Sequence, residues 1–323
     1  MAVTIGLDFG ARSTEIYIKG KGIVLREPTV AAVDAKGNVT AVGTEALLIR
    51  GRAPGTVTIR RPISDNAITD FNLAAETLDR FLEIAAPRAR KHVFAAAKYS
   101  FGSKNREMLY QALCDCRTGK VELVESALAS LLGSGFGLRA EHETDNSGTI
   151  LCDIGASSIE ASYIRGGVLL RSDNCAGGGE AADQAIIAYL RRRYGLAITS
   201  VTARELKHQL DLTVDPVPLT ATGLDGSTGM PRRITIRSEE LYRPCAPQIE
   251  GAVEAIRASI TNLPRQGTAE STVDRIIITG GGVCLPGAAE YIADSLEREI
   301  MMPDNPLDCT VAGLGKMIEG NMK

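Results

Sequence analysis

The sequence predicts an α/β protein with two related domains, each a mixed sheet flanked by helices. Length is the first reason, because 323 residues with 44% hydrophobic content are enough for a large core and two domains. The second is that short apolar runs alternate with segments of helical spacing. The third is a pattern that occurs twice, D-x-G-A-x-S-x-E, starting at Asp8 and at Asp153. A repeat of such long period favours two related domains over a solenoid.

Each copy of the repeat reads as a hairpin in which an apolar strand, an acidic turn and a second strand follow one another. Short apolar runs also predict buried strands, and the best examples are residues 3–7, 149–152 and 275–279. Two segments look like small inserted subdomains, because they are rich in short strands and turns. We therefore expect domain I at 1–148 plus 303–323 with its insert at about 27–71, and domain II at 149–302 with its insert at about 195–240.

Two helices are predicted from apolar spacing. Steps of three and four between 249 and 263 place the apolar residues on one face, and Ser238 is the expected N-cap of this helix. The second helix covers 182–190 and ends in three arginines and Gly195. The arginines could bind an anion, but cations suit the last turn of a helix and glycine is a normal stop.

Composition excludes several classes of protein. The formal net charge is −3 with both signs interspersed, which is unlike the basic surface of a nucleic-acid binder. No stretch approaches the roughly 18 apolar residues of a membrane span, and Asp8 interrupts the first apolar run too early for a signal peptide. We expect a soluble, cytoplasmic protein. Its seven cysteines include no C-x-x-C pair, so reduced thiols are favoured over a zinc site at Cys114 and Cys116.

The two D-x-G turns allow a structural and a functional interpretation. Asp and Gly suit any hairpin turn. Glycine also lets backbone N–H groups approach a phosphate, while an aspartate can hold Mg²⁺ through water. A third glycine cluster, at 280–282 in "IIITGGGVCLPG", follows a buried strand and fits neither a Walker A loop nor G-x-G-x-x-G. Three such points in one chain predict a nucleotide in a cleft between two lobes.

These three motifs resemble the phosphate-1, phosphate-2 and adenosine motifs of the actin-like ATPase superfamily. Within it, the chain resembles the MreB family of bacterial actins almost end to end, as a divergent member. Matching segments include "GIVLREPTVAAV", "GGGEAADQAIIAYLRRRYGLAI", "TARELKHQL", "TGMPRRITIRSEEL" and "DRIIITGGG". The resemblance implies an actin-like fold of four subdomains around a nucleotide cleft, ATP or ADP with Mg²⁺ as cofactors, and head-to-tail filaments.

The resemblance also implies roles for individual residues. The magnesium-side aspartates match Asp8 and Asp153. Positions that match the phosphate loops are Gly10, Ala11, Ser13, Gly155, Ala156, Ser157 and Ser158. Positions that match the nucleoside pocket, in a register fixed to within about one residue, are Gly178, Glu205, Lys207, Gly280, Gly281 and Gly282.

The second phosphate loop departs from the family pattern. The family usually reads D-I-G-G-G-T-T-E, whereas residues 153–160 read D-I-G-A-S-S-I-E. Each added side chain restricts the backbone angles and narrows the approach to a phosphate.

The catalytic carboxylate departs as well. The family orients the attacking water from an E-E-P segment, and an ungapped match puts Ser126 at the usual glutamate, with Glu125 one position earlier. Glu125 is the candidate catalytic residue, and its alternative role is a charge in the first turn of a helix. We expect a slow ATPase that forms ADP and phosphate, with weak or lost hydrolysis as the alternative.

A further departure concerns the membrane. Relatives often carry an N-terminal amphipathic helix or an exposed apolar loop, whereas here a strand starts at Val3 and the corresponding loop, "APRARKHV", is basic. We expect weaker direct membrane binding than in typical relatives, with filaments held near the membrane through adaptor proteins.

Two functions follow from the resemblance. The first is a cytoskeletal ATPase whose nucleotide-dependent filaments organise cell shape or the cell interior. The alternative is a non-polymerising, nucleotide-regulated adaptor or chaperone-like protein, although no peptide-binding domain is appended. A sugar kinase comes third, because the chain has no extra substrate domain.

Overall fold

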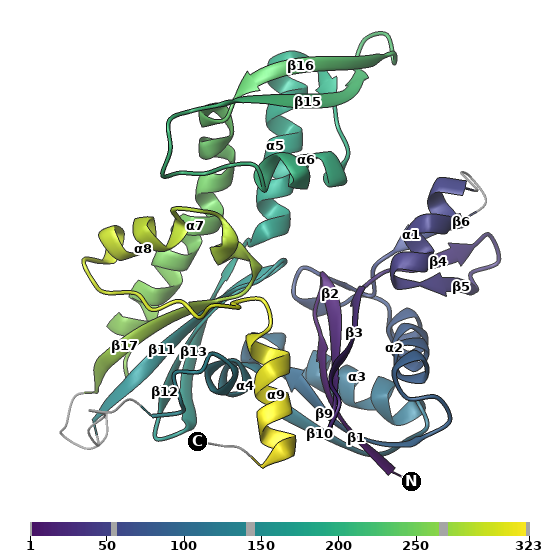
Figure 1. Cartoon of the computed structure of the whole chain (residues 1–323), viewed down its shortest axis with the longest axis vertical. Helices are drawn as coiled ribbons and strands as arrows, with labels where there is room; N and C mark the ends of the chain where they lie inside the picture. Colours follow the sequence, from purple (N-terminus) through teal and green to yellow (C-terminus); the bar gives the residue numbers. More distant parts are fainter. Residues whose placement is uncertain (1, 53–56, 140–145, 265–270, 321–323) are drawn as a thin grey trace. The chain divides into compact units, whose positions relative to one another are not determined.

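The computed structural model describes residues 2–52, 57–139, 146–264 and 271–320, and the chain divides into two compact units. Unit 1 gathers residues 1–145, 164–170 and 303–323, and unit 2 gathers 146–163 and 171–302. Figure 1 labels most of the helices and strands of both units.

Unit 1 is centred on a mixed sheet with the strand order β10-β9-β1-β2-β3. The strands are β1 (Ala2–Phe9), β2 (Ser13–Ile18), β3 (Gly22–Pro28), β9 (Arg90–Ala97) and β10 (Thr118–Glu125). β1 is parallel to β9 and antiparallel to β2. The helices of this unit are α2 (Phe71–Ala85), α3 (Gly102–Asp115), α4 (Ser126–Gly133) and α9 (Cys309–Glu319), with a 3₁₀ turn at Tyr99–Phe101.

Helix α2 shows how the sequence sets these elements. Asp70 is its N-cap, and the carboxylate accepts a hydrogen bond from the Leu73 N–H at 3.0 Å, which satisfies one of the free amides at a helix start. Leu73, Leu78, Phe81 and Leu82 form its buried face, as the steps of three and four predict.

The C-terminal helix α9 packs closely on α4 (Figure 1). Glycines make this approach possible, since a Cβ added at Gly133 would lie 2.7 Å from the Gly313 nitrogen. Leu314 of α9 is completely buried with Ala96 and Ala129, so the end of the chain completes the core of unit 1.

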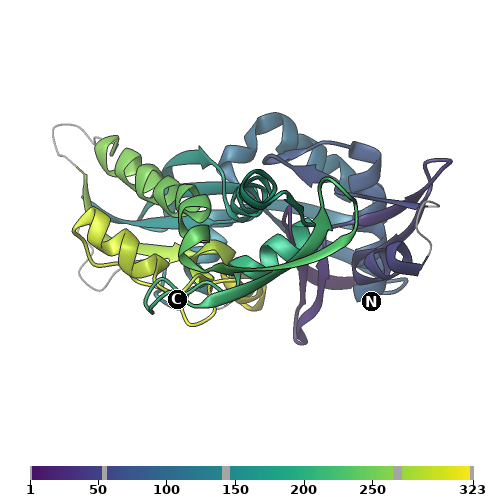
Figure 2. The same cartoon turned by 90° about the horizontal axis from the view of Figure 1, so that it is seen from above.

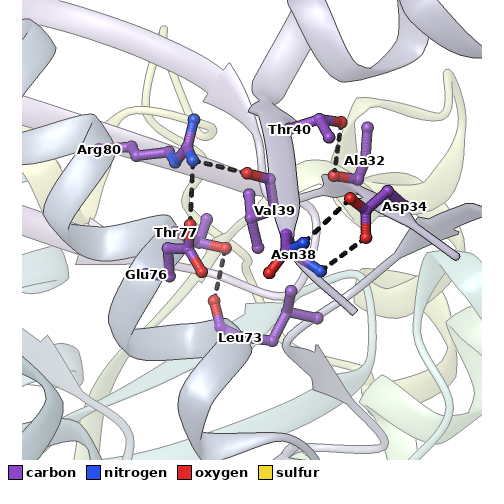
Figure 3. Close-up of polar contacts among 9 residues, drawn as sticks. All are labelled: Ala32, Asp34, Asn38, Val39, Thr40, Leu73, Glu76, Thr77 and Arg80. Atoms are coloured by element: carbon purple, nitrogen blue, oxygen red, sulfur yellow. Dashed lines mark hydrogen bonds and ion pairs between the residues drawn. The ribbon is translucent and has the colours of Figure 1, made fainter. Parts of the chain in front are cut away.

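A small insert follows β3 in unit 1. Its elements are β4 (Ala31–Asp34), β5 (Val39–Val42), α1 (Gly43–Arg52) and β6 (Val57–Arg60), and a short hairpin of β7 (Ile63–Ser64) and β8 (Ala67–Ile68) comes next. Asp34 closes the β4–β5 turn by accepting hydrogen bonds from Asn38, and Arg80 of α2 donates to the Val39 carbonyl at 2.6 Å (Figure 3). Arg80 therefore ties the insert to α2.

Unit 2 repeats the plan with a sheet in the order β13-β12-β11-β17. The strands are β11 (Ser147–Ile154), β12 (Ser158–Arg165), β13 (Val168–Ala176) and β17 (Thr272–Thr279), with β11 and β17 parallel. The helices are α5 (Gly179–Tyr194), α7 (Glu239–Thr261) and α8 (Ala288–Leu296), after a 3₁₀ turn at Gly281–Cys284. The yellow-green α8 lies beside the green α7 (Figure 2).

The insert of unit 2 is a second sheet with α6 beside it. The sheet has the order β14-β15-β16, and its elements are β14 (Leu196–Ala197), α6 (Ser200–Lys207), β15 (Pro218–Asp225) and β16 (Pro231–Arg237). Leu219, Ala221 and Ile236 turn into the main core of unit 2, which the period-2 alternation of a half-buried strand explains.

The structure confirms both helices predicted from spacing, as α5 and α7. Ser238 occupies the N-cap position of α7 as predicted, but it does not cap the helix with its side chain. Its side chain makes no capping bond, because the hydroxyl accepts the Val217 N–H at 3.0 Å. All seven cysteines are free thiols, and no metal-binding group of three or more His, Cys, Asp or Glu occurs in the described part of the chain.

Candidate functional site

The first D-x-G turn connects β1 to β2 in unit 1. The Gly10 N–H donates to the Ser13 carbonyl at 3.0 Å, and a Cβ at Gly10 would lie 2.9 Å from that same oxygen. Arg61 donates to the Ala11 carbonyl at 2.9 Å, which fixes the middle of the turn. Asp8 stands at the end of β1, directly opposite Glu15.

The second turn, in unit 2, has the same closure. The Gly155 N–H donates to the Ser158 carbonyl at 2.9 Å, and Asp153 lies at the end of β11. The repeated sequence pattern therefore builds the same backbone turn twice, once in each unit. In both turns the glycine amide is committed to closing the turn.

Helix α5 begins on the second turn. The Gly179 and Glu180 N–H groups donate to the carbonyls of Gly155 and Ala156 at 3.0 and 2.9 Å. Gly178, just before the helix, has φ +92°, and a Cβ there would lie 2.5 Å from the Gly155 oxygen. Both the positive φ and the close contact require glycine at position 178. These contacts bring the predicted residues Gly155, Ala156 and Gly178 together.

The third glycine cluster packs on the end of β11. A Cβ at Gly280, whose φ is +88°, would lie 2.6 Å from the Ile154 carbonyl oxygen and closer still to Asp153 Oδ1. At Gly282 an added Cβ would collide with the Ile154 side chain. The buried Gln248 of α7, which is 4% exposed, fixes this loop, because its side-chain amide donates to the Gly282 carbonyl at 3.1 Å. Gln248 was not predicted from the sequence.

The two departures in the second turn cause no backbone strain. Neither Ala156 nor Ser157 is among the non-glycine residues with positive φ, so an L-amino acid fits at both positions. Ser158 is buried at the start of β12. The substitutions thus change which atoms face this turn without forcing the chain into a glycine-only conformation.

Glu205 and Lys207 lie in very different surroundings on α6. Glu205 is exposed. Lys207 is buried, donates to the Gly179 carbonyl at 2.6 Å and pairs with Asp183 of α5 at 2.7 Å. Asp183 lies inside the apolar face of α5 and is 3% exposed. A single carboxylate on the apolar face of α5 is the sequence feature from which Asp183 could have been predicted as part of the site.

Glu125 is held by an arginine in unit 1. Arg106 of α3 donates to both carboxylate oxygens, at 2.7 and 3.1 Å, and also contacts the Ala97 and Lys98 carbonyls. Glu125 ends β10, and Ser126 is buried as the first residue of α4. A bidentate pair of this kind is strong and orients the carboxylate firmly.

Glu15, which lies opposite Asp8, is a buried acidic residue beside the first turn. Burial raises the pKa of Glu15, although the Ser13 hydroxyl and the nearby Arg26 act in the opposite direction. Glu15 is 8% exposed, and the acidic neighbour that adds to its raised pKa is Asp308.

Comparison with known proteins gives a consistent result. The family model described as MreB/Mbl protein matches residues 2–323. The chain is 30% identical to the cell shape-determining protein Mbl of Bacillus subtilis, over 98% of this chain and 95% of the relative. It is 28% identical to the cell shape-determining protein MreB of Escherichia coli, over 98% and 93%.

Solved structures show the same fold. MreB 5 of Spiroplasma citri bound to AMPPNP has a TM-score of 0.85 at 23% identity, over 100% of this chain and 98% of that one. A MamK double helical filament has a TM-score of 0.81 at 18% identity, over 99% of both chains. The predicted actin-like α/β fold is confirmed.

Proposed function

This chain belongs to the MreB/Mbl family, and from that premise we propose that it is an ATP-binding bacterial actin homologue that assembles nucleotide-dependent cytoskeletal filaments. Its relatives carry the name cell shape-determining protein. Similar structures include MreB 5 bound to AMPPNP and to ADP, and a MamK filament. A role in cell shape or internal organisation follows for this chain.

The observation that carries the nucleotide proposal is the close packing of Gly178 and Gly280 on the turn at the end of β11, which we call the cradle. Gly178 and Gly280 both bring backbone within a distance that no side chain allows, at the turn that starts with Asp153. Backbone N–H groups of such glycine-lined turns, other than the amides that close them, suit phosphate oxygens. In this proposal the phosphates lie on the two D-x-G turns, from Gly10 to Ser13 and from Gly155 to Ser158, and the nucleoside lies at Gly280–Gly282.

Magnesium fits the same arrangement. Asp8 and Asp153 are each the next-to-last residue of a strand that leads into a D-x-G turn, and Mg²⁺ is usually bound by one or two carboxylates together with phosphate oxygens and water. The ion would neutralise charge on the phosphates. In this proposal Asp8 and Asp153 hold it, mainly through water.

Hydrolysis is proposed to be slow. A general base must reach the water that it activates, and both oxygens of Glu125 are already hydrogen-bonded by Arg106. Ser126 cannot supply a carboxylate. The chain would therefore stay in its ATP-bound form for long periods.

The proposed partner is a second copy of the chain, joined head to tail. Such heterologous contacts produce open filaments unless the rotation closes a ring. Adaptor proteins would connect the filaments to the membrane, and the cytoplasm is the proposed location. Among the described helices, none combines the length and the apolar character needed to cross a membrane.

Filament assembly can be tested directly. Purified protein with Mg-ATP is expected to pellet on ultracentrifugation and to show protofilaments in negative stain, whereas nucleotide-free protein should stay in the supernatant. A chain that stays monomeric at high concentration under every nucleotide condition would contradict the filament proposal.

A second function is favoured by the Arg106–Glu125 pair. A chain that binds ATP and hardly hydrolyses it could act as a nucleotide-regulated adaptor without assembling. Retention of ATP through gel filtration, with no pelleting, would support this function over the first.

A further inference from the structure

Lys207 is a buried cation that connects α6 to the first turn of α5. Its ammonium lies 2.6 Å from the Gly179 carbonyl and 2.7 Å from Asp183 Oδ1, and 8% of the residue is exposed. Asp183 also lies 3.5 Å from Arg204. The Lys207 ammonium is thus paired with one carboxylate and hydrogen-bonded to one carbonyl, as a buried charge requires.

The residue that receives Lys207 also holds the second D-x-G turn. The Gly179 carbonyl accepts from Lys207, and the Gly179 N–H donates to the Gly155 carbonyl at 3.0 Å. The next amide, of Glu180, donates to the Ala156 carbonyl at 2.9 Å. A continuous hydrogen-bonded chain therefore runs from α6 through the start of α5 to the turn.

The charges near this cluster are mixed. Lys207 and Arg204 pair with Asp183, while Glu180 lies in the first turn of α5 and Glu205 lies close to Arg204. The N-terminus of the 16-residue helix α5 favours negative charge. Lys207 acts on the turn through its hydrogen bond to the Gly179 carbonyl.

We propose that Lys207 and Asp183 are positioning residues that hold the turn at 153–158 in the conformation that binds a polyphosphate, and that Lys207 does not recognise the nucleoside. This proposal rests on the nucleotide function proposed above. It differs from the role implied by family resemblance, in which Lys207 lines the ribose and adenine pocket.

A series of ligands separates the two roles. A residue that positions the phosphate turn affects Mg-ATP much more than AMP, because the turn meets the terminal phosphates. A residue that contacts the ribose or base affects both ligands equally, because both carry the same nucleoside. The decisive quantity is the ratio of the Kd for AMP to the Kd for Mg-ATP.

The main variant is Lys207→Met, which keeps the length of the side chain and removes its charge. We expect the Kd for Mg-ATP to rise about tenfold or more, the scale of a lost charge-assisted hydrogen bond, while the Kd for AMP stays within about twofold. Lys316→Met is the matched control. Lys316 also donates to a helix carbonyl, that of Leu132 at 2.8 Å, but in unit 1, and both affinities should stay unchanged.

Two further variants keep the test interpretable. Lys207→Met leaves the buried Asp183 carboxylate poorly compensated, so the double variant Lys207→Met with Asp183→Asn removes both charges and should show the same selective loss. Lys207→Arg, which keeps a cation, should recover part of the Mg-ATP affinity. Circular dichroism establishes that each variant is folded.

Hydrogen exchange tests the same chain of contacts without nucleotide. In the wild type, the Gly179 and Glu180 amides should exchange slowly, and in Lys207→Met they should exchange faster, whereas Lys316→Met should match the wild type. If Mg-ATP does not bind to the wild type, the proposed function fails, and this exchange measurement still tests the link itself. Equal losses for AMP and Mg-ATP, no loss for either ligand, or unchanged exchange would each overturn the positioning role.

Discussion

Gly280→Ala is expected to destabilise unit 2 and to weaken Mg-ATP binding, and Gly37→Ala provides a matched control. The two glycines have nearly the same φ, +88° and +90°, but an added Cβ meets nothing within 4 Å at Gly37. At Gly280 it would lie 2.6 Å from the Ile154 carbonyl oxygen and closer to Asp153. Both substitutions place alanine at a positive φ, but a collision with neighbouring atoms occurs at Gly280 and not at Gly37.

The magnitudes follow from these contacts. A non-glycine residue held at an unfavourable positive φ costs about 1–3 kcal/mol, and relieving an overpacked contact costs about 1–3 kcal/mol more. Gly37→Ala should therefore lose about 1–3 kcal/mol of unfolding free energy, and Gly280→Ala, with φ +88° and ψ 173°, about 2–6 kcal/mol. Because Asp153 must shift to make room, the Kd for Mg-ATP should rise at least about tenfold in Gly280→Ala only.

Urea unfolding followed by circular dichroism measures the stability, since the chain has no tryptophan to report by fluorescence. Isothermal titration calorimetry measures the affinity. Equal stability losses in the two variants, or a Gly280→Ala protein that binds Mg-ATP as the wild type does, would contradict the proposed role of the close contacts of Gly280.

Three further predictions concern other parts of the chain. Cys284 is exposed beside the third glycine cluster, and it should be alkylated more slowly when Mg-ATP is present. The exposed Cys114 of unit 1 is the control and should react at the same rate with or without Mg-ATP, as measured by peptide mass spectrometry. Equal protection of both thiols would argue against a nucleoside at residues 280–282. Ser126→Glu should raise the rate of phosphate release severalfold with little change in the Kd for Mg-ATP, and an unchanged rate would show that position 126 does not limit hydrolysis. The hydrogen bond to Glu240 raises the pKa of Tyr194 to about 12, above the ordinary value of about 10, so the stability that this bond contributes is complete below pH 10 and is lost as the pH rises towards 12. In Tyr194→Phe, the urea midpoint of unfolding should fall less over this pH range than in the wild type. An equal fall in both proteins would contradict the role of the pair.

Local features explain what the sequence could predict. The two D-x-G turns depend on a few adjacent residues, and each closes with a bond between Gly10 and Ser13 or between Gly155 and Ser158. Helix α7 depends on spacing within one segment. Family membership, inferred from matching segments, is confirmed by the match over residues 2–323.

Side-chain partners were harder to predict because they come from distant parts of the chain. Asp183 and Lys207 meet across two helices, and Arg106 reaches Glu125 from another element. The Ser238 hydroxyl is taken by the Val217 amide instead of capping α7. In each case the nearest sequence neighbours gave no sign of the partner, since packing decides which groups meet. The roles of the predicted site residues stay predictions.

The close packing of α9 on α4 has a consequence for how the protein is made. Unit 1 needs α9, which occupies 309–319, to cover Ala96 and Ala129, but the ribosome adds this helix after every residue of unit 2. Domains usually fold as they emerge, the N-terminal one first. We expect the reverse order here, because the chain of unit 2 is complete before the last helix of unit 1 is made. The face of α4 that packs on α9 would then stay uncovered until the end of synthesis.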